Sequence, residues 1–190
     1  MDRLLELKRK HEEGEFPSLT SEQITGQSIV FILAGFETTA STLSSLTYSL
    51  VKNSEVLERL VTEVEDVLDT FEGRVDQETI ADMPYLEACI KETLRMFPPV
   101  SRTDRTCVQD WQEDGLFIPK GEDQVTPLPR PLVAGMNILI PVYVIHHNPL
   151  LWPEPELFQP ERFLKDNSSS IQPCSWIPFG AGPRVCIGSS

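Results

Sequence analysis

The 190-residue chain has the length of one domain with a substantial hydrophobic core. Hydrophobic residues make up 40% of it and charged residues 24%, which is an ordinary globular composition. With 16 basic and 29 acidic residues the net charge is -13, which argues against a nucleic-acid partner. The longest unbroken apolar run, IVFILAGF at 29–36, is too short to cross a bilayer, so we expect no membrane segment in this sequence.

The four cysteines, Cys89, Cys107, Cys174 and Cys186, stand in four unlike contexts with no CxxC pair. This pattern argues against a disulfide scaffold or a zinc site and fits a reducing compartment. We expect Cys89, which lies on a predicted helix, to be part of the core.

The first long element is predicted to be a helix. Residues 1–19 are charged and irregular, which is typical of a linker. Thr20 and Gln23 have the spacing of a capping box and predict a helix from there to about Lys52. Its first half is apolar on nearly every side, as in a helix buried within a larger body.

Two further helices follow. The second is capped by Asn53 or Ser54, and apolar residues repeat over 57–68 with helical spacing. The third begins at Pro84, a favourable first-turn proline, and ends at the proline pair 98–99.

The second half of the chain favours short strands and coil. Strand-like runs are TCV at 106–108, LFIPKG at 116–121 and NILIPVYV at 137–144. Pro141 would confine the last of these to a sheet edge, and the proline-rich segment 122–134 reads as an exposed loop. The last fifty residues read as extended coil held by side-chain anchors, with Trp152 and Trp176 as candidates. The predicted fold class is α+β, mainly α.

Cys186 stands in an unusual segment, PFGAGPRVCIGSS at 178–190. Glycines at 180, 182 and 188 allow tight turns and close approach of the backbone to a bound group. Backbone N–H groups aimed at a sulfur would keep it as the thiolate that a metal needs. We therefore interpret Cys186 as a ligand to a haem iron. Arg184 would pair with a haem propionate, and Phe179 would cover the side of the haem on which the sulfur lies.

The same residues carry a family signature. Phe179, Gly182, Arg184, Cys186 and Gly188 fill all five fixed positions of F-x-x-G-x-R-x-C-x-G. The sequence thus resembles the cytochrome P-450 family, the haem-thiolate monooxygenases. With average residue usage, such a match arises by chance about once in 10^7 starting points. The competing reading, a buried free cysteine in a proline-glycine turn, does not account for it.

The motif AGFETT at 34–39 places a glycine and hydroxyls inside the long helix. Gly35 should cost about 1 kcal/mol there relative to alanine, and threonines that bond backbone carbonyls should loosen the helix further. A buried threonine is commonly satisfied in this way without any function, but a lone carboxylate at Glu37 is harder to explain. The resemblance implies that Thr38 positions the oxygen ligand and its waters and that Glu37 relays protons.

A third motif is E-x-x-R at Glu92 and Arg95, which alone predicts only a solvated helix pair worth a few tenths of a kcal/mol. The downstream segment FQPERF at 158–163 changes this reading. The resemblance implies that Glu92, Arg95 and Arg162 form a buried cluster that fixes the coil beneath the haem. It also suggests Arg102 as a propionate partner.

The histidine pair 146–147 looks like a metal site. We give it no ligand role, because neighbours on an extended chain point to opposite faces and the family has a similar turn without ligands.

The resemblance runs from about Thr20 to Gly188 and is closest to microsomal members near the drug-oxidising and thromboxane synthase group. Family members are more than twice this length. The resemblance therefore implies that 20–190 is the C-terminal part of a catalytic domain, incomplete at both ends and without the membrane anchor of the full-length protein.

The implied function is a monooxygenase that contains haem b and inserts one oxygen atom from O2 into a small lipophilic substrate. Electrons would come from NADPH through NADPH-cytochrome P-450 reductase, with cytochrome b5 as a further partner, at the cytosolic face of the endoplasmic reticulum membrane. Two alternatives stay open: a haem-thiolate isomerase that rearranges a peroxide without a reductase, and a non-catalytic truncated product that cannot hold haem.

Overall fold

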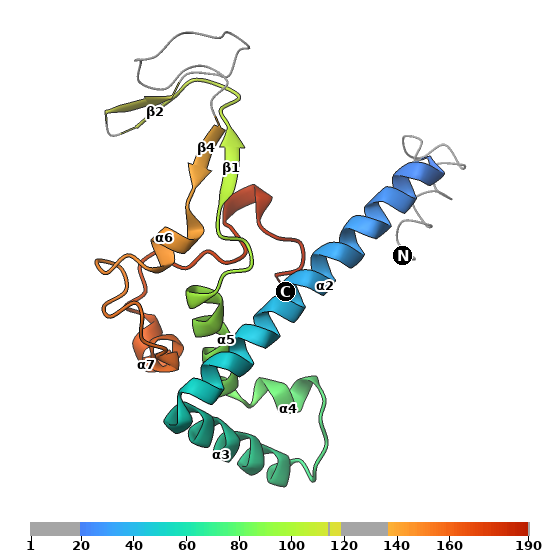
Figure 1. Cartoon of the computed structure of the whole chain (residues 1–190), viewed down its shortest axis with the longest axis vertical. Helices are drawn as coiled ribbons and strands as arrows, with labels where there is room; N and C mark the ends of the chain where they lie inside the picture. The colour runs from blue at the N-terminus through green and yellow to red at the C-terminus, as the bar shows by residue number, and fades with distance from the viewer. Residues whose placement is uncertain (1–19, 114, 119–136, 190) are drawn as a thin grey trace. The chain divides into compact units, whose positions relative to one another are not determined.

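A computed structural model describes residues 20–113, 115–118 and 137–189 (Figure 1). The linker expected at 1–19 and the loop expected at 122–134 lie outside the described residues. The chain divides into a first unit ending at Ser44 and a second unit that runs from Ser45 to its end. The first unit holds most of the long helix, and the second holds its last turns and all other elements.

Helix α2 spans Ser21–Lys52, as the sequence predicts. The capping box that starts it is formed in both directions. The Thr20 N–H donates to Gln23 Oε1 at 2.9 Å, and the Gln23 N–H donates to Thr20 Oγ1 at 3.2 Å. The helix continues without a break through Gly35, so the glycine and hydroxyls do not interrupt it.

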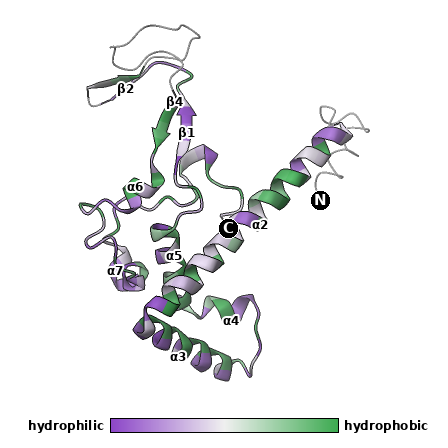
Figure 2. Ribbon diagram, viewed as in Figure 1, coloured by the Kyte–Doolittle hydropathy of each residue, from purple (hydrophilic) through white to green (hydrophobic). Residues whose placement is uncertain are grey.

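Most of the large apolar residues of α2 are exposed in this chain. Figure 2 shows the hydrophobic stretch along the helix, and all six large side chains of the run 29–36 are more than half exposed: Ile29, Val30, Phe31, Ile32, Leu33 and Phe36. By length and composition α2 could cross a membrane, whereas the longest apolar run alone predicted no such segment. Central helices of soluble proteins have the same length and composition. The motif within α2, rather than its hydropathy, therefore indicates its role.

The second unit is built around three further helices, α3 (Ser54–Thr70), α4 (Gln77–Ala81) and α5 (Pro84–Met96). The bounds of α3 and α5 follow the sequence prediction, whereas α4 was not predicted. Helices α3 and α5 form a core with the end of α2 and the coil, which is apolar apart from the Tyr85 hydroxyl and consists of Leu46, Leu60, Tyr85, Cys89, Met96 and Phe158. Burial raises the pKa of the Cys89 thiol to about 12, so this cysteine is a packing residue, as expected.

The predicted Asn53 cap of α3 is not formed, and the cap of α4 was not predicted. Asn53 precedes α3, but its side chain does not cap it, because its Nδ2 donates to the Ser49 carbonyl at 2.7 Å. Asp76 caps α4 by accepting the Thr79 N–H at 3.0 Å.

The start of α5 is held by a carboxylate from another helix. Pro84 occupies its first turn, where a missing N–H costs little. The next two N–H groups, of Tyr85 and Leu86, donate to the two carboxylate oxygens of Glu63 on α3, each at 2.8 Å. Glu63 thus caps α5 from a distance and fixes its direction.

Strands are few in the described chain. β1 (Thr103–Thr106) pairs antiparallel with β4 (Asn137–Ile140), and β2 (Trp111–Glu113) with β3 (Leu116–Ile118). The prediction of one strand over 137–144 was wrong beyond Ile140. Pro141 precedes the short helix α6 (Val142–His146) because its fixed φ and missing N–H end the ladder and suit a helix start.

The rest is coil with short helical turns, η1 (Pro160–Phe163), α7 (Lys165–Ser168) and η2 (Gly182–Arg184). As expected, both tryptophans anchor it. The Trp152 indole donates to the Ser175 carbonyl at 3.3 Å, and the Trp176 indole donates to the Lys91 carbonyl at 3.2 Å. The fold class, α+β and mainly α, is confirmed.

Replacing Glu63, the distant cap of α5, tests its contribution to the free energy of unfolding. In Glu63→Gln only one oxygen remains to accept, so one of the two N–H groups loses its partner. We expect the free energy of unfolding to fall by about 1 kcal/mol, measured by urea denaturation. Glu65→Gln, at an exposed position of the same helix, should change it by less than about 0.5 kcal/mol. Equal losses in the two variants would contradict the capping role.

Candidate active site

The turn that carries Cys186 is closed by backbone hydrogen bonds. The Cys186 N–H donates to the Phe179 carbonyl at 2.9 Å, and the Val185 N–H donates to the Gly182 carbonyl at 3.0 Å. Gly180 and Gly182 both have a φ of 76°, in the left-handed region that disfavours other residues. The turn therefore presents Cys186 as an exposed free thiol on a defined backbone.

The surroundings of this thiol fit a flat group approaching the sulfur. A Cβ added at Gly188 would lie 4.0 Å from Cys186 Sγ, so a larger residue there would occupy space beside the sulfur. Phe179 is half-buried, with its ring edge-on to Trp176 at 6.4 Å, and Arg184 is exposed. Haem iron can be held by one cysteine sulfur, and this open, glycine-lined turn offers one.

Glu92 and Arg95 form a fully buried ion pair on α5. The guanidinium Nε and Nη2 donate to the two Glu92 oxygens at 2.7 and 2.8 Å, and both side chains have no exposed area. The remaining donors of Arg95 reach the end of helix α6, at the His146 carbonyl (2.9 Å), and the coil, at the Pro155 carbonyl (2.8 Å). This bidentate pair therefore ties α5 to two segments more than fifty residues away.

Arg162 joins the cluster more loosely. Its Nε lies 3.5 Å from Glu92 Oε1, and its Nη2 donates to the Glu154 carbonyl at 3.0 Å. Burial lowers the pKa of Arg162, and the attraction of Glu92 opposes that shift. Among the described residues its Nε is a buried atom without a hydrogen-bond partner. The structure thus brings the three predicted residues together, with Glu92 between the two arginines.

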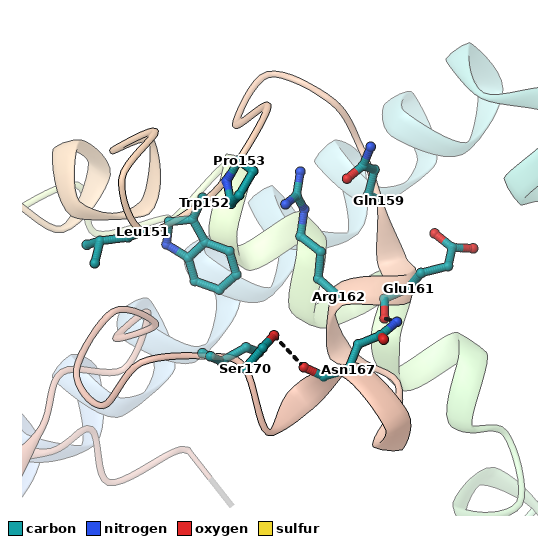
Figure 3. Close-up of a pocket in the computed structure, with 9 residues that line it drawn as sticks. Leu151, Trp152, Pro153, Gln159, Glu161, Arg162, Asn167 and Ser170 are labelled. Carbon is teal, nitrogen blue, oxygen red and sulfur yellow. Dashed lines mark hydrogen bonds between the residues drawn. The ribbon is translucent and has the colours of Figure 1, made fainter.

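A shallow hollow opens beside Arg162 (Figure 3). Its rim includes Leu151, Trp152 and Asn167, and the Ser170 hydroxyl donates to the Asn167 carbonyl at 2.7 Å. None of the residues that line it belongs to the turn 178–189. The hollow therefore belongs to the coil that the cluster holds and not to the thiol site.

His146 is a residue whose part in this region the sequence did not reveal. His146 is the last residue of helix α6 and His147 is its C-cap, so the pair is not on extended chain and the geometric reason given against a joint role was wrong. His146 is completely buried, whereas His147 stacks on Tyr143 with ring centroids 4.0 Å apart. His146 Nδ1 lies 3.1 Å from the Arg95 carbonyl, and its Nε2 accepts the Ile177 N–H at 2.9 Å.

These two contacts determine which nitrogen of the His146 ring carries the proton. Since Nε2 accepts, the proton of the neutral ring is on Nδ1, which donates to the Arg95 carbonyl. Burial lowers the pKa of His146 to about 4, although the bond to the Arg95 carbonyl partly opposes this. Its partners lie 51 and 31 residues away in the sequence, so no local pattern could have predicted them.

The remaining predicted residues lie in helix α2 and before strand β1. The Thr38 hydroxyl donates to the Ala34 carbonyl at 2.6 Å, which is the self-satisfied arrangement the sequence allowed. Glu37 is exposed on α2. Arg102 is exposed in the coil that leads into β1.

Comparison with known proteins decides the family. The model of the cytochrome P450 family matches residues 1–190, the whole chain. The chain belongs to the cytochrome P450 family. The family named from the sequence is thereby confirmed.

Among its relatives are P450s of the 3A group. The chain is 40% identical to mouse cytochrome P450 3A16 over 180 residues, covering 95% of this chain and 33% of that protein. It is 42% identical to mouse cytochrome P450 3A41 and 40% identical to human cytochrome P450 3A7, each over 171 residues, 90% of this chain and 31% of the relative. The chain thus spans about a third of the length of these relatives.

Removing one charge of the buried pair should be severe. In Glu92→Gln the Arg95 guanidinium stays buried without its counter-charge, and we expect a loss of about 3–5 kcal/mol in the free energy of unfolding. Urea denaturation measures it. Glu87→Gln on the same helix breaks only the exposed pair with Lys91 and should lose less than about 0.5 kcal/mol. A loss in Glu92→Gln as small as that of the control would contradict the role of the cluster.

The neutral state of His146 predicts a pH dependence. Between its unfolded pKa of 6.5 and its folded pKa of about 4, the unfolded chain binds the extra proton. Stability should therefore be full above pH 6.5 and fall as the pH drops towards 4, by about 3 kcal/mol from this group. The free energy of unfolding in urea, measured from pH 7 to 4, should fall less steeply in His146→Gln than in the wild type.

The neighbouring histidine provides the control. His147→Gln should keep the wild-type slope. The carboxylates that also titrate in this range are common to all three proteins and therefore do not affect the comparison of their slopes. Identical slopes in His146→Gln and the wild type would show that His146 is not held neutral.

Proposed function

We propose that the protein to which this chain belongs is a monooxygenase that inserts one oxygen atom from O2 into a small lipophilic organic substrate. The observation that carries the proposal is the exposed Cys186 thiol on the signature turn, in a chain whose whole length matches the cytochrome P450 family. Cys186 is the residue proposed to hold haem b, through its sulfur. When bound, haem supplies oxygen activation, and donation from a cysteine thiolate favours cleavage of the O–O bond.

The chain's own residues have distinct proposed tasks at this site. The hydrogen bond from the Cys186 N–H to the Phe179 carbonyl holds the sulfur in place, and Gly188 leaves open space beside it. Arg184 and Arg102, both exposed, are the proposed cations for the haem propionates.

On helix α2, Glu37 and Thr38 are the proposed proton-relay residues. The Thr38 hydroxyl donates to the Ala34 carbonyl in this structure. Rotation about its side-chain bond would free it to receive a proton from the protonated Glu37 carboxyl group while it releases its own, and the Glu37 carboxylate would then take up a new proton from solvent. This pair favours monooxygenation over the rearrangement of a peroxide, because rearrangement consumes no protons.

The electrons, partners and location follow from the family resemblance. We propose that NADPH supplies two electrons through NADPH-cytochrome P-450 reductase, with cytochrome b5 as a second donor. The proposed location is the cytosolic face of the endoplasmic reticulum membrane. The exposed glycine-lined turn is compatible with a redox partner that approaches from the Cys186 side, since its residues around 181–189 are open to solvent.

A pair of cysteine variants tests the proposed function. The full-length gene product, loaded with haem, reduced and exposed to carbon monoxide, should show the strongly red-shifted Soret band of a thiolate ligand and oxidise substrate only with NADPH and reductase. Cys186→Ser should lose both properties because it removes the thiolate. Cys174→Ser, at another exposed free cysteine, should keep both. Undiminished turnover in Cys186→Ser would contradict the proposed function.

A further inference from the structure

The turn that carries Cys186 is connected at its start to one buried side chain. The Ile177 N–H donates to His146 Nε2 at 2.9 Å, and the Ile177 carbonyl accepts the Gly180 N–H at 3.0 Å. Two residues after Ile177, the Phe179 carbonyl accepts the Cys186 N–H at 2.9 Å. The backbone that closes on Cys186 therefore begins at the bond to His146.

His146 is itself held by the buried ion pair. Its Nδ1–H donates to the Arg95 carbonyl, and its own carbonyl accepts from Arg95 Nη1 at 2.9 Å. Both side chains are completely buried, so neither of these contacts competes with water. The two residues thus bond each other twice, once through the ring and once through the guanidinium.

We infer that His146 is a positioning residue that sets the place of Cys186 by coupling the Glu92–Arg95 pair to the start of the ligand turn. This inference rests on the proposed function, in which Cys186 is the haem ligand. His146 does not touch the reacting atoms and acts through Ile177. The buried Ile177 N–H would lack an acceptor without the ring nitrogen, so losing it should favour turn conformations that move the sulfur away.

Two substitutions separate the ring's two bonds. In His146→Gln the side-chain Oε1 reaches roughly the place of Nε2 and can still accept the Ile177 N–H. In His146→Asn the amide Nδ2 reaches roughly the place of Nδ1 and can still donate to the Arg95 carbonyl, but nothing accepts from Ile177. The second variant thus breaks the link to the turn and the first preserves it.

The experiment uses the full-length gene product loaded with haem, reduced and exposed to carbon monoxide. We expect His146→Asn to convert a large part of the red-shifted thiolate Soret band into the band of a neutral-thiol complex. His146→Gln should resemble the wild type. Independently of haem spectra, amide hydrogen exchange at Ile177 should be about tenfold faster in His146→Asn than in His146→Gln.

A stability control distinguishes positioning from general loosening. Cys89→Ala removes a buried core side chain in the cluster around Leu60 and Tyr85 and should destabilise the protein without shifting the Soret band. Conversion of the band in Cys89→Ala as large as that in His146→Asn would overturn the inference, and so would an unshifted band in His146→Asn. A wild-type protein that lacks the thiolate band would instead overturn the proposed function, and this inference with it.

Discussion

The buried pair of Glu92 and Arg95 is the contact on which the rest of the second unit depends. Two charges without any exposed area are unfavourable unless nearly all their donors and acceptors are used. Arg95 meets this demand with the Glu92 carboxylate and with backbone carbonyls of two distant segments. Glu92 also accepts the Gln159 N–H at 2.9 Å. The coil has to lie against α5 in one way because any other position would leave these charges unsatisfied.

This constraint explains how a region with so little regular structure keeps one conformation. Coil has no ladder of its own, so each buried N–H and C=O needs a partner from elsewhere. Here side chains provide them: Trp152 and Trp176 bond backbone carbonyls, and His146 accepts a backbone N–H. A row of aromatic contacts that joins these two indoles through Phe163 adds packing to the same segments. The thiol turn can therefore be exposed at its tip and still be firmly held at its base.

Local structure followed the sequence where short-range chemistry decided it. The capping box at Thr20 and the first-turn proline at Pro84 marked helix starts correctly, because both signals depend on residues within one helical turn. The same reasoning failed at Pro141, where apolar alternation favoured a continued strand and the proline instead began a short helix. It also missed α4, whose five residues are too few for a periodic pattern.

The family, and the chemistry that its signature implies, could be predicted from the sequence, because the spacing of Phe179, Arg184 and Cys186 is a property of one short segment. It also named the members of the buried cluster, but only through resemblance. The tertiary structure alone decided which carbonyls Arg95 bonds, that Glu63 caps α5, and that His146 connects the ion pair to the thiol turn. These contacts join residues that are 22 to 60 positions apart, and no local pattern can encode partners that only folding brings within hydrogen-bond distance.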